Sequence, residues 1–298
     1  MRLRHGAALA ILVGVLAGCI APAERTTTPS PTRAIRVPPP QALRFEASDL
    51  KVGGAQEQGG WLRGSVPHGT TRLVLDGTEL PIASGRYFFA GIDRDSPPQL
   101  TITATAADGR SVSRKITIAR RDWQIERVNV PLRGSVPSET FMAQRRPELA
   151  RIAAARAIRS ETTGWAQTFV WPVSGRISGR FGSQRIYQGV PGAYHSGLDI
   201  TTGGSGAPYV APADGVVVLA AEKPFTLEGN LLIIDHGMGL NSAFLHSSRL
   251  AVKEGERVRQ GQVIGYIGAT GRATGPHLHW SLKWQDARLD PLLFLPPQ

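Results

Sequence analysis

The sequence predicts a mainly β protein, with a small N-terminal β-sandwich, a helical connector and a C-terminal antiparallel β domain. The first observation is punctuation: 34 glycines and 22 prolines among 298 residues favour short strands and turns over long helices. The second is a repeated pattern of short apolar runs that end at turn residues. The third is size, because a chain of this length with 41% hydrophobic residues can bury the core of two domains.

Residues 1–18 have the features of a secretory signal. Arg2 and Arg4 precede an apolar run, 7–16, that is too short to span a bilayer stably. The segment Leu16-Ala17-Gly18-Cys19 resembles the lipobox of bacterial lipoproteins, in which the cysteine becomes lipid-modified; the alternative is an ordinary signal peptide with a chance cysteine. Position 20 is Ile and not Asp, which by resemblance to lipoprotein sorting in Gram-negative bacteria implies an outer-membrane anchor facing the periplasm.

Residues 19–42 are expected to form an extended tether, because they are rich in Pro, Thr and Arg. Cys19 is the single cysteine of the chain, so an internal disulfide and a cysteine-rich zinc site are both excluded. Any metal must therefore be held by histidines and carboxylates.

Residues 43–136 carry the pattern of a small antiparallel β-sandwich. An apolar run at 71–75 leads into the hairpin pair Asp76-Gly77, and a second alternating run at 100–106 returns after Asp108-Gly109. The region has one histidine, His68, and neither an acid pair nor a phosphate-binding loop, so no catalytic chemistry is expected in it. A spacer or wall-binding module is the simpler interpretation, and a cover over the active site is the alternative.

Residues 137–164 are expected to form a helical connector. Pro147 suits the first turn of a helix, and Leu149 and Ile152 begin an apolar stripe at helical spacing. The many arginines of this segment are most simply a solvated face.

Residues 165–298 are expected to form an antiparallel, mainly β domain. Short apolar runs recur there with glycines between them every eight to twelve residues. The runs lie at 209–210, 215–220, 230–235, 240–246, 262–267 and 278–282.

The formal net charge of +11 comes largely from arginine, which supplies 29 of the 34 basic residues. Such a charge favours attraction to a polyanion, such as an anionic wall polymer or lipid headgroups. No run of five basic residues occurs, so a nucleic-acid-binding arm is not expected. The glycine-rich segments 203–206 and 265–275 lack the ending of a phosphate-binding loop, so no nucleotide site is expected.

Histidines carry the chemistry that this sequence suggests. In an extended strand His277 and His279 share one face, which suits a metal ion, although two polar residues on a solvated strand face are the alternative. Asp199 follows His195 by four residues, and Gly197 between them argues against a helix, so a bent segment must bring the two side chains together. With His279 they supply two imidazoles and one carboxylate, a set that leaves a position open for water.

These residues, in this order, resemble the signature of the lysostaphin/LytM-type zinc metalloendopeptidases, which cut peptidoglycan peptides. His195-x-x-x-Asp199 and His277-x-His279 carry the resemblance, and it extends over about residues 165–298. Further similar blocks are Gly179-Arg180-Phe181-Gly182, Ala211-Pro212-Ala213-Asp214-Gly215, Ile234-Asp235-His236-Gly237, Gly261-Gln262-Val263-Ile264-Gly265 and Thr270-Gly271-Arg272-Ala273-Thr274-Gly275-Pro276.

The resemblance implies that His195, Asp199 and His279 bind Zn²⁺. It implies that His277 acts beside the metal as a general base or as a hydrogen-bond donor to the oxyanion, and that His246 is a further catalytic histidine. Ser247 departs from the Leu that is usual after this histidine, which bears on substrate fit and not on the metal site.

Three further polar residues of the domain are assigned to structure. His236 lies in a turn and is expected to be a hydrogen-bonded structural histidine. Asp214 and Asp235 stand near glycines and are expected to serve turns, not acid catalysis.

Three functions are open. The first is hydrolysis of peptidoglycan cross-links or stem peptides, with a D-alanyl to diaminopimelyl bond as the natural substrate in a Gram-negative host. The second is regulation of another wall hydrolase without catalysis. In lipoproteins that act in this way the LytM-type domain has lost its metal ligands. The third is an iron(II) oxygenase, which is disfavoured because its carboxylate normally follows the histidine by two positions.

Overall fold

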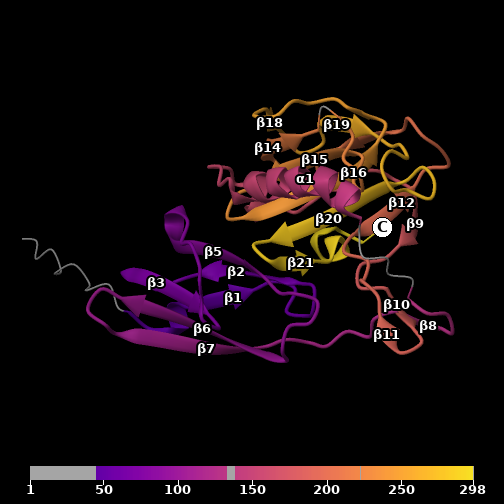
Figure 1. The fold of residues 1–298 in the computed structure, drawn as a ribbon. Coiled ribbons are helices and arrows are strands. Elements are labelled where there is room, and N and C mark those ends of the chain that lie inside the picture. The colour runs from indigo at the N-terminus through magenta and orange to yellow at the C-terminus, as the bar shows by residue number, and fades with distance from the viewer. Residues whose placement is uncertain (1–44, 133–137, 222, 298) are drawn as a thin grey trace, which may run out of the picture. The chain divides into compact units, whose positions relative to one another are not determined.

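The computed structural model describes residues 45–132, 138–221 and 223–297, and these are mostly strands with one α-helix (Figure 1). The expected secretory signal, Cys19 and the tether up to residue 42 lie outside the described residues. Among the described residues, none of the helices has the length and apolar composition to cross a membrane.

Two antiparallel sheets occupy the N-terminal region. One has the order β1 (Lys51–Gly53), β2 (Trp61–Ser65) and β5 (Tyr87–Gly91); the other has the order β4 (Thr78–Glu79), β3 (Thr70–Leu75), β6 (Gln99–Ala106) and β7 (Ser111–Thr117). Short 3₁₀ turns, Ala47–Asp49 and Ser84–Arg86, lie before β1 and β5. The buried residues of the two sheets belong to one hydrophobic cluster, as a sandwich requires.

The hairpin predicted at Asp76-Gly77 is confirmed. Leu75 pairs with Thr78 across it, and both turn residues have positive φ, 42° for Asp76 and 84° for Gly77. Asp and Gly are the residues that tolerate this backbone, so the local sequence fixes the turn.

Helix α1 (Glu139–Ala157) begins earlier than predicted. Ser138 caps it, because the Ser138 hydroxyl accepts a hydrogen bond of 3.1 Å from the Phe141 amide. Pro147 lies inside the helix, so its assignment to the first turn was wrong. The helix tolerates the missing amide of Pro147 because it also packs through Ile152 and Ala155 against a second hydrophobic cluster, to which β14 and β15 contribute.

The expectation that the arginines of α1 are solvated was wrong for two of them. Arg145 is 7% exposed, and its two terminal nitrogens each lie 2.6 Å from a carboxylate oxygen of Glu228. Burial of Arg156 lowers its pKa to about 10. Residue type alone predicted the solvated face, whereas the packing of α1 on the sheet decided the burial.

A sheet of eight strands forms the frame of the C-terminal region. Its order is β18 (Arg257–Val258), β14 (Gly215–Ala220), β15 (Asn230–Asp235), β16 (Leu240–Ser247), β20 (Leu278–Trp284), β12 (Leu198–Thr201) and β9 (Arg176–Gly179), with β21 (Ala287–Leu289) paired to β20. A second sheet has the order β13 (Pro208–Val210), β19 (Val263–Tyr266) and β17 (Arg249–Leu250). All of these pairs are antiparallel, and the six predicted apolar runs all fall on strands. Short 3₁₀ turns, Gly164–Ala166 and Pro291–Phe294, flank the region.

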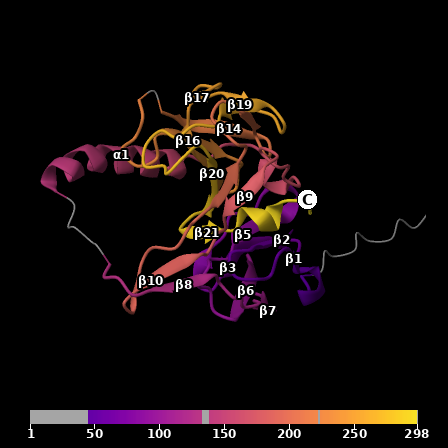
Figure 2. The same ribbon diagram turned by 90° about the vertical axis from the view of Figure 1, so that its right-hand side faces the viewer.

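One small sheet joins distant parts of the sequence. β8 (Ile125–Val128) pairs in parallel with β10 (Gln184–Tyr187), which pairs with β11 (Val190–Pro191); Figure 2 shows β8 beside β10. This parallel pair is an exception to the predicted antiparallel pairing. It also ties residues predicted for the N-terminal sandwich to the segment that precedes His195.

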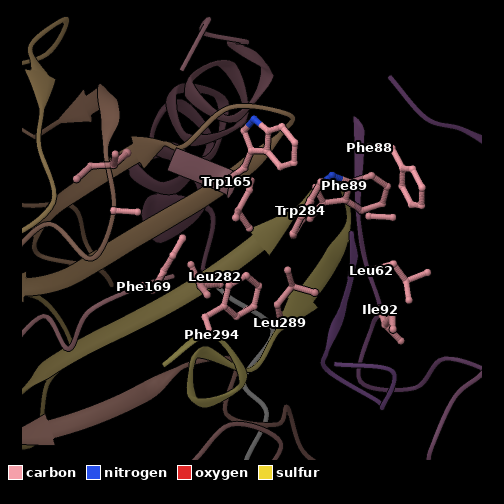
Figure 3. Close-up of a cluster of buried hydrophobic side chains, with 14 of the residues drawn as sticks. Leu62, Phe88, Phe89, Ile92, Trp165, Phe169, Leu282, Trp284, Leu289 and Phe294 are labelled. Carbon is pink, nitrogen blue, oxygen red and sulfur yellow. The ribbon is translucent and has the colours of Figure 1, made fainter. Parts of the chain in front are cut away.

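An aromatic cluster connects the two β regions (Figure 3). Phe89 of β5 lies 6.4 Å from Trp165, 6.5 Å from Trp284 and 6.4 Å from Phe294, measured between ring centroids. Leu43–Gln298 therefore forms one compact unit around a shared core.

Candidate metal centre

Strand register brings the predicted ligands together at one end of the eight-stranded sheet. Asp199 lies directly opposite His279 across the β12–β20 ladder. In β20 buried residues alternate with partly buried ones, so Leu278 and Trp280 point into the core while His279 points the other way. The predicted alternation of this strand is confirmed.

The three predicted ligands form a tight group of donor atoms. His279 Nδ1 lies 2.8 Å from Asp199 Oδ1 and 3.1 Å from His195 Nε2, and the latter atom lies 3.1 Å from Asp199 Oδ1. Among the described residues, this is the one group of three His, Cys, Asp or Glu side chains whose donor atoms could share a metal ion.

Each member of the group is oriented by a neighbour. The His195 ring donates through Nδ1 to the Arg180 carbonyl at 3.0 Å, which leaves the Nε2 lone pair facing the group. Burial favours neutral His195, but the hydrogen bond and charge of Asp199 outweigh burial and raise the His195 pKa. Burial likewise opposes ionisation of Asp199, yet hydrogen bonds from His195 and His279 hold the pKa of this carboxyl well below its usual range. Burial lowers the pKa of His279, and Asp199 offsets this only in part.

Two glycines allow the close approach. A Cβ at Gly179 would lie 2.4 Å from Asp199 Oδ2, and one at Gly197 would lie 2.6 Å from His279 Nε2. Neither position has room for a side chain, so both glycines are required by the packing of the donor group.

His246 and His277 lie beside this group. The His277 Nε2 atom is 3.7 Å from Asp199 Oδ1, and its Nδ1 donates to the Gly275 carbonyl at 2.8 Å. The His246 ring centroid lies 5.1 Å from that of His277, and its Nδ1 donates to the Thr270 carbonyl at 2.8 Å. Burial lowers the pKa of His246, which favours the neutral ring.

The position of His246 could not be derived from strand alternation. Its φ is 63°, so the chain leaves the strand conformation at this residue and the side chain does not follow the alternation of β16. Only the resemblance of Ala243-Phe244-Leu245-His246 to the family pattern indicated it.

The residues assigned to structure are all hydrogen-bonded. His236 is fully buried, with Nδ1 2.8 Å from the Asp214 carbonyl and Nε2 2.7 Å from the Ser242 hydroxyl, and burial lowers its pKa to about 4. The Asp235 carboxylate accepts from the backbone and hydroxyl of Ser160 and from the Gly237 amide. His236 is hydrogen-bonded as predicted. Asp235, predicted as a turn residue, is the last residue of strand β15, and its carboxylate accepts from the turn that follows.

A groove of about 790 Å³ adjoins the donor group. His195 and Asp199 line it together with Arg180 and Arg272, and β8 contributes Glu126 to its wall. No sequence signal indicated β8, because its part in the groove depends on a pairing between distant segments.

Comparison with known proteins identifies the region that carries this site. Residues 193–291 match the profile of peptidase family M23. The chain contains a peptidase family M23 domain. The matched residues include all five histidine and aspartate positions of the donor group and its neighbours.

Individual proteins similar to this chain include hydrolases and an activator. This chain is 35% identical to peptidoglycan DD-endopeptidase ShyB of Vibrio cholerae over 135 residues. The aligned region covers 45% of this chain and 28% of ShyB. This chain is 28% identical to murein hydrolase activator NlpD of Salmonella dublin over 237 residues. That aligned region covers 78% of this chain and 59% of NlpD. The chain thus spans less than two thirds of either relative.

A solved structure matches more of the chain than the family profile does. The crystal structure of a protein assigned to peptidase M23 from Pseudomonas aeruginosa superposes with a TM-score of 0.62 and 29% sequence identity. The match covers 80% of this chain and 94% of that one, so it includes residues on both sides of α1.

Proposed function

We propose that this protein is a zinc-dependent endopeptidase that hydrolyses peptide cross-links or stem peptides of peptidoglycan in wall remodelling. The observation that carries the proposal is the convergence of His195 Nε2, Asp199 Oδ1 and His279 Nδ1 beside an open groove. We assign the catalytic part to residues 165–298.

The donor group fits zinc. Two imidazole nitrogens and one carboxylate oxygen form a ligand set that is typical of catalytic zinc. In tetrahedral coordination with bonds of about 2.0–2.1 Å, ligand atoms lie about 3.3 Å apart. The separations of 2.8–3.1 Å in this chain need only a small expansion to reach that geometry. When bound, zinc would supply a polarised scissile carbonyl and a water acidic enough to ionise near neutral pH.

The chain's own histidines would handle the protons. Because Nδ1 of His246 and of His277 each donates to a carbonyl, the Nε2 atom of each neutral ring carries the lone pair. We assign His277 as general base or, once protonated, as donor to the oxyanion, and His246 as the second proton-carrying group.

The bond that we propose is the D-alanyl to diaminopimelyl cross-link of a Gram-negative wall. The similarity to a protein named as a peptidoglycan DD-endopeptidase supports this choice. We also propose a lipid anchor on Cys19 that holds the protein at the outer membrane, facing the periplasm; the sequence Leu16-Ala17-Gly18-Cys19 supports it. Metabolic labelling with a fatty-acid analogue should label the wild type and not Cys19→Ser.

The deciding experiment is mass spectrometry of purified sacculi digested with protein that begins after Cys19, with and without a chelator. We expect a chelator-sensitive loss of cross-linked dimers, and the products identify the bond. Zinc titration of the metal-free protein gives a second readout, and we expect one site whose affinity drops in Asp199→Ala. Bound iron without zinc would overturn the hydrolase proposal.

A second candidate function is activation of another wall hydrolase without catalysis. The similarity to a murein hydrolase activator favours it, because that match extends over 78% of this chain. In the same sacculus assay this candidate predicts no products from the protein alone and faster release when a wall hydrolase is added.

A further inference from the structure

The groove beside the donor group has a wall that comes from outside the family-matched residues. Glu126 lies on β8, Gln124 directly precedes β8, and Arg185 lies on β10. The match to peptidase family M23 begins only at residue 193. These residues of the wall therefore lie outside the segment that matches the family profile.

Several contacts fix the wall against the segment that leads to His195. The Gln184 amide donates to the Gln124 carbonyl at 3.0 Å, in line with the parallel β8–β10 ladder. The Trp123 ring packs on Phe181 and fills the space over Gly182, where a Cβ would lie 2.1 Å from the indole. A groove with such support is formed before a ligand arrives.

The groove carries two cations without a partner. Arg185 is paired, because its Nε lies 2.7 Å from a Glu126 carboxylate oxygen. Arg180 and Arg272 also line the groove and are exposed, and within the described part of the chain their guanidinium groups make no ion pair or hydrogen bond. The remaining acid of the groove, Asp199, is committed to the donor group.

We propose that Arg180 and Arg272 bind a carboxylate of an acidic peptide substrate. This inference rests on the proposed function in that the groove receives a peptide. A guanidinium group presents paired donors that match a carboxylate, and exposed unpaired arginines need not break another contact to do so. Arg180 and Arg272 line the same groove as His195 and Asp199, so a bound carboxylate would lie near the donor group.

The test uses two peptides that differ only in one group, a free carboxylate or its neutral carboxamide, with zinc-loaded protein that begins after Cys19. We expect the wild type to favour the acid by about tenfold in kcat/KM. Arg180→Gln and Arg272→Gln should each reduce this preference, and the double variant should abolish it. Arg176→Gln removes an exposed arginine of β9 outside the groove and is the matched control.

Two outcomes would overturn the inference: a preference that the groove variants leave unchanged, or an equal loss on the neutral peptide. The affinity of both peptides, measured by fluorescence anisotropy, tests the carboxylate site separately from the proposed function. If neither peptide is cut, but the acid binds better and the double variant loses this difference, the endopeptidase proposal fails and the carboxylate site stands.

An independent observation concerns α1 and His246. In the Arg145–Glu228 pair Arg145 is buried and Glu228 is partly buried, and both hydrogen bonds are 2.6 Å. The Glu228 carbonyl accepts from the His246 amide at 2.8 Å. The next residue, Gly229, packs so tightly on Thr270 that a Cβ would lie 2.2 Å from the Thr270 hydroxyl, and the Thr270 carbonyl holds the His246 ring.

We infer that Arg145 is a positioning residue for His246. The left-handed backbone of His246 is costly for a residue with a side chain, so the contacts around it must hold it in place. The Arg145 fork fixes Glu228, and Glu228 fixes the His246 amide. The inference shares with the proposed function the assignment of His246 to catalysis.

The variant Arg145→Lys keeps the charge and removes the fork, so Glu228, which is partly buried, is not left without a cation. We expect kcat to fall about tenfold with KM and zinc content unchanged, since a small misplacement of a proton-carrying group affects the chemical step. Arg151→Ala is the matched control, because Arg151 also links α1 to the sheet region through Glu254, at 3.0 Å, but on the surface. We expect the double variant Arg145→Glu with Glu228→Arg, which exchanges the two charges, to have a higher kcat than Arg145→Glu alone.

An unchanged kcat in Arg145→Lys, or an equal fall in Arg151→Ala, would contradict the positioning role. Loss of zinc in parallel with kcat would show that the pair supports the fold in general. Failure of the wild type to cut sacculi defeats the proposed function, and the chemical shifts of the His246 ring, expected to move in Arg145→Lys only, then test the inference alone.

Discussion

Two histidines at opposite ends of the β15–β16 pair show how environment separates structure from chemistry. His236 follows β15 where Asp235 pairs with Asn241, and both of its ring nitrogens are hydrogen-bonded. His246 lies near the other end, where Asn230 pairs with Ser247. Its Nδ1 is hydrogen-bonded, and among the described residues its Nε2 has no hydrogen-bond partner.

The difference lies in what each ring can still do. His236 is fully buried and fully bonded, so it can only hold its neighbours together. His246 keeps a free nitrogen beside His277 and close to His279, whose ring centroid is 6.2 Å away. A buried histidine with one nitrogen free and other histidines nearby is the better candidate for proton transfer.

The largest expected effect concerns two histidines, His279 on β20 and His277 directly before it. His279→Ala should lose both zinc and activity, because it removes a donor atom. His277→Ala should lower kcat by about 10²–10⁴-fold and keep most of the zinc. Metal analysis and kcat/KM on the same samples check this, and equal metal loss in both variants would mean that their roles are wrongly assigned.

Replacing each of these two histidines by alanine tests the comparison directly. His246→Ala should lower kcat by about 10²-fold with little change in Tm. His236→Ala should keep the kcat of folded protein but reduce the free energy of unfolding by about 2–4 kcal/mol, because it leaves a cavity and removes the hydrogen bonds of His236 to the Asp214 carbonyl and the Ser242 hydroxyl. Urea unfolding and kinetics measure both; a normal stability in His236→Ala would remove the distinction.

The glycines of the donor group give a finer test. Gly197→Ala should weaken zinc binding by about tenfold or more, because the new methyl group displaces His279. Gly204→Ala is the matched control, since a Cβ there meets nothing within 4 Å. Zinc titration compares the two, and equal affinities would show that the site tolerates the shift.

The smallest effect is a pH dependence of stability. Burial lowers the His236 pKa to about 4 in the folded state, against 6.5 for the unperturbed group. The unfolded chain therefore binds a proton first, and the free energy of unfolding should fall by up to about 1.4 kcal/mol per pH unit as the pH drops from about 6.5 to about 4. Unfolding curves across this range should be flatter in His236→Gln; equal slopes would contradict the assignment.

Local sequence predicted much of the fold, because strands and hairpins leave periodic patterns and turn residues. The alternation at 277–280 and the six apolar runs are of this kind. What it could not predict depends on distant partners. β8 pairs with β10 across 59 residues, the burial of Arg145 depends on Glu228, and the φ of His246 depends on the chain around Thr270.

The sequence predicted which three residues form the donor group, but not which strands bring them together. The spacing of His195 and Asp199 indicated a bent segment, and strand register then explains why Asp199 faces His279. Arg180 and Arg272 stand in blocks that resemble the family pattern, but the sequence did not show that their side chains line one groove, because they are 92 positions apart and only the fold brings them together.

The parallel β8–β10 pair also has a consequence for how the chain can be shortened. In a fragment that starts at residue 165, the side of β10 that β8 occupies would present unpaired backbone groups, and such open edges promote aggregation. A soluble catalytic fragment should therefore retain β8 and Trp123, whether as part of the chain or as an added peptide strand. In folding, this edge closes only after the N-terminal region has been placed, so the groove should be among the last parts of the molecule to form.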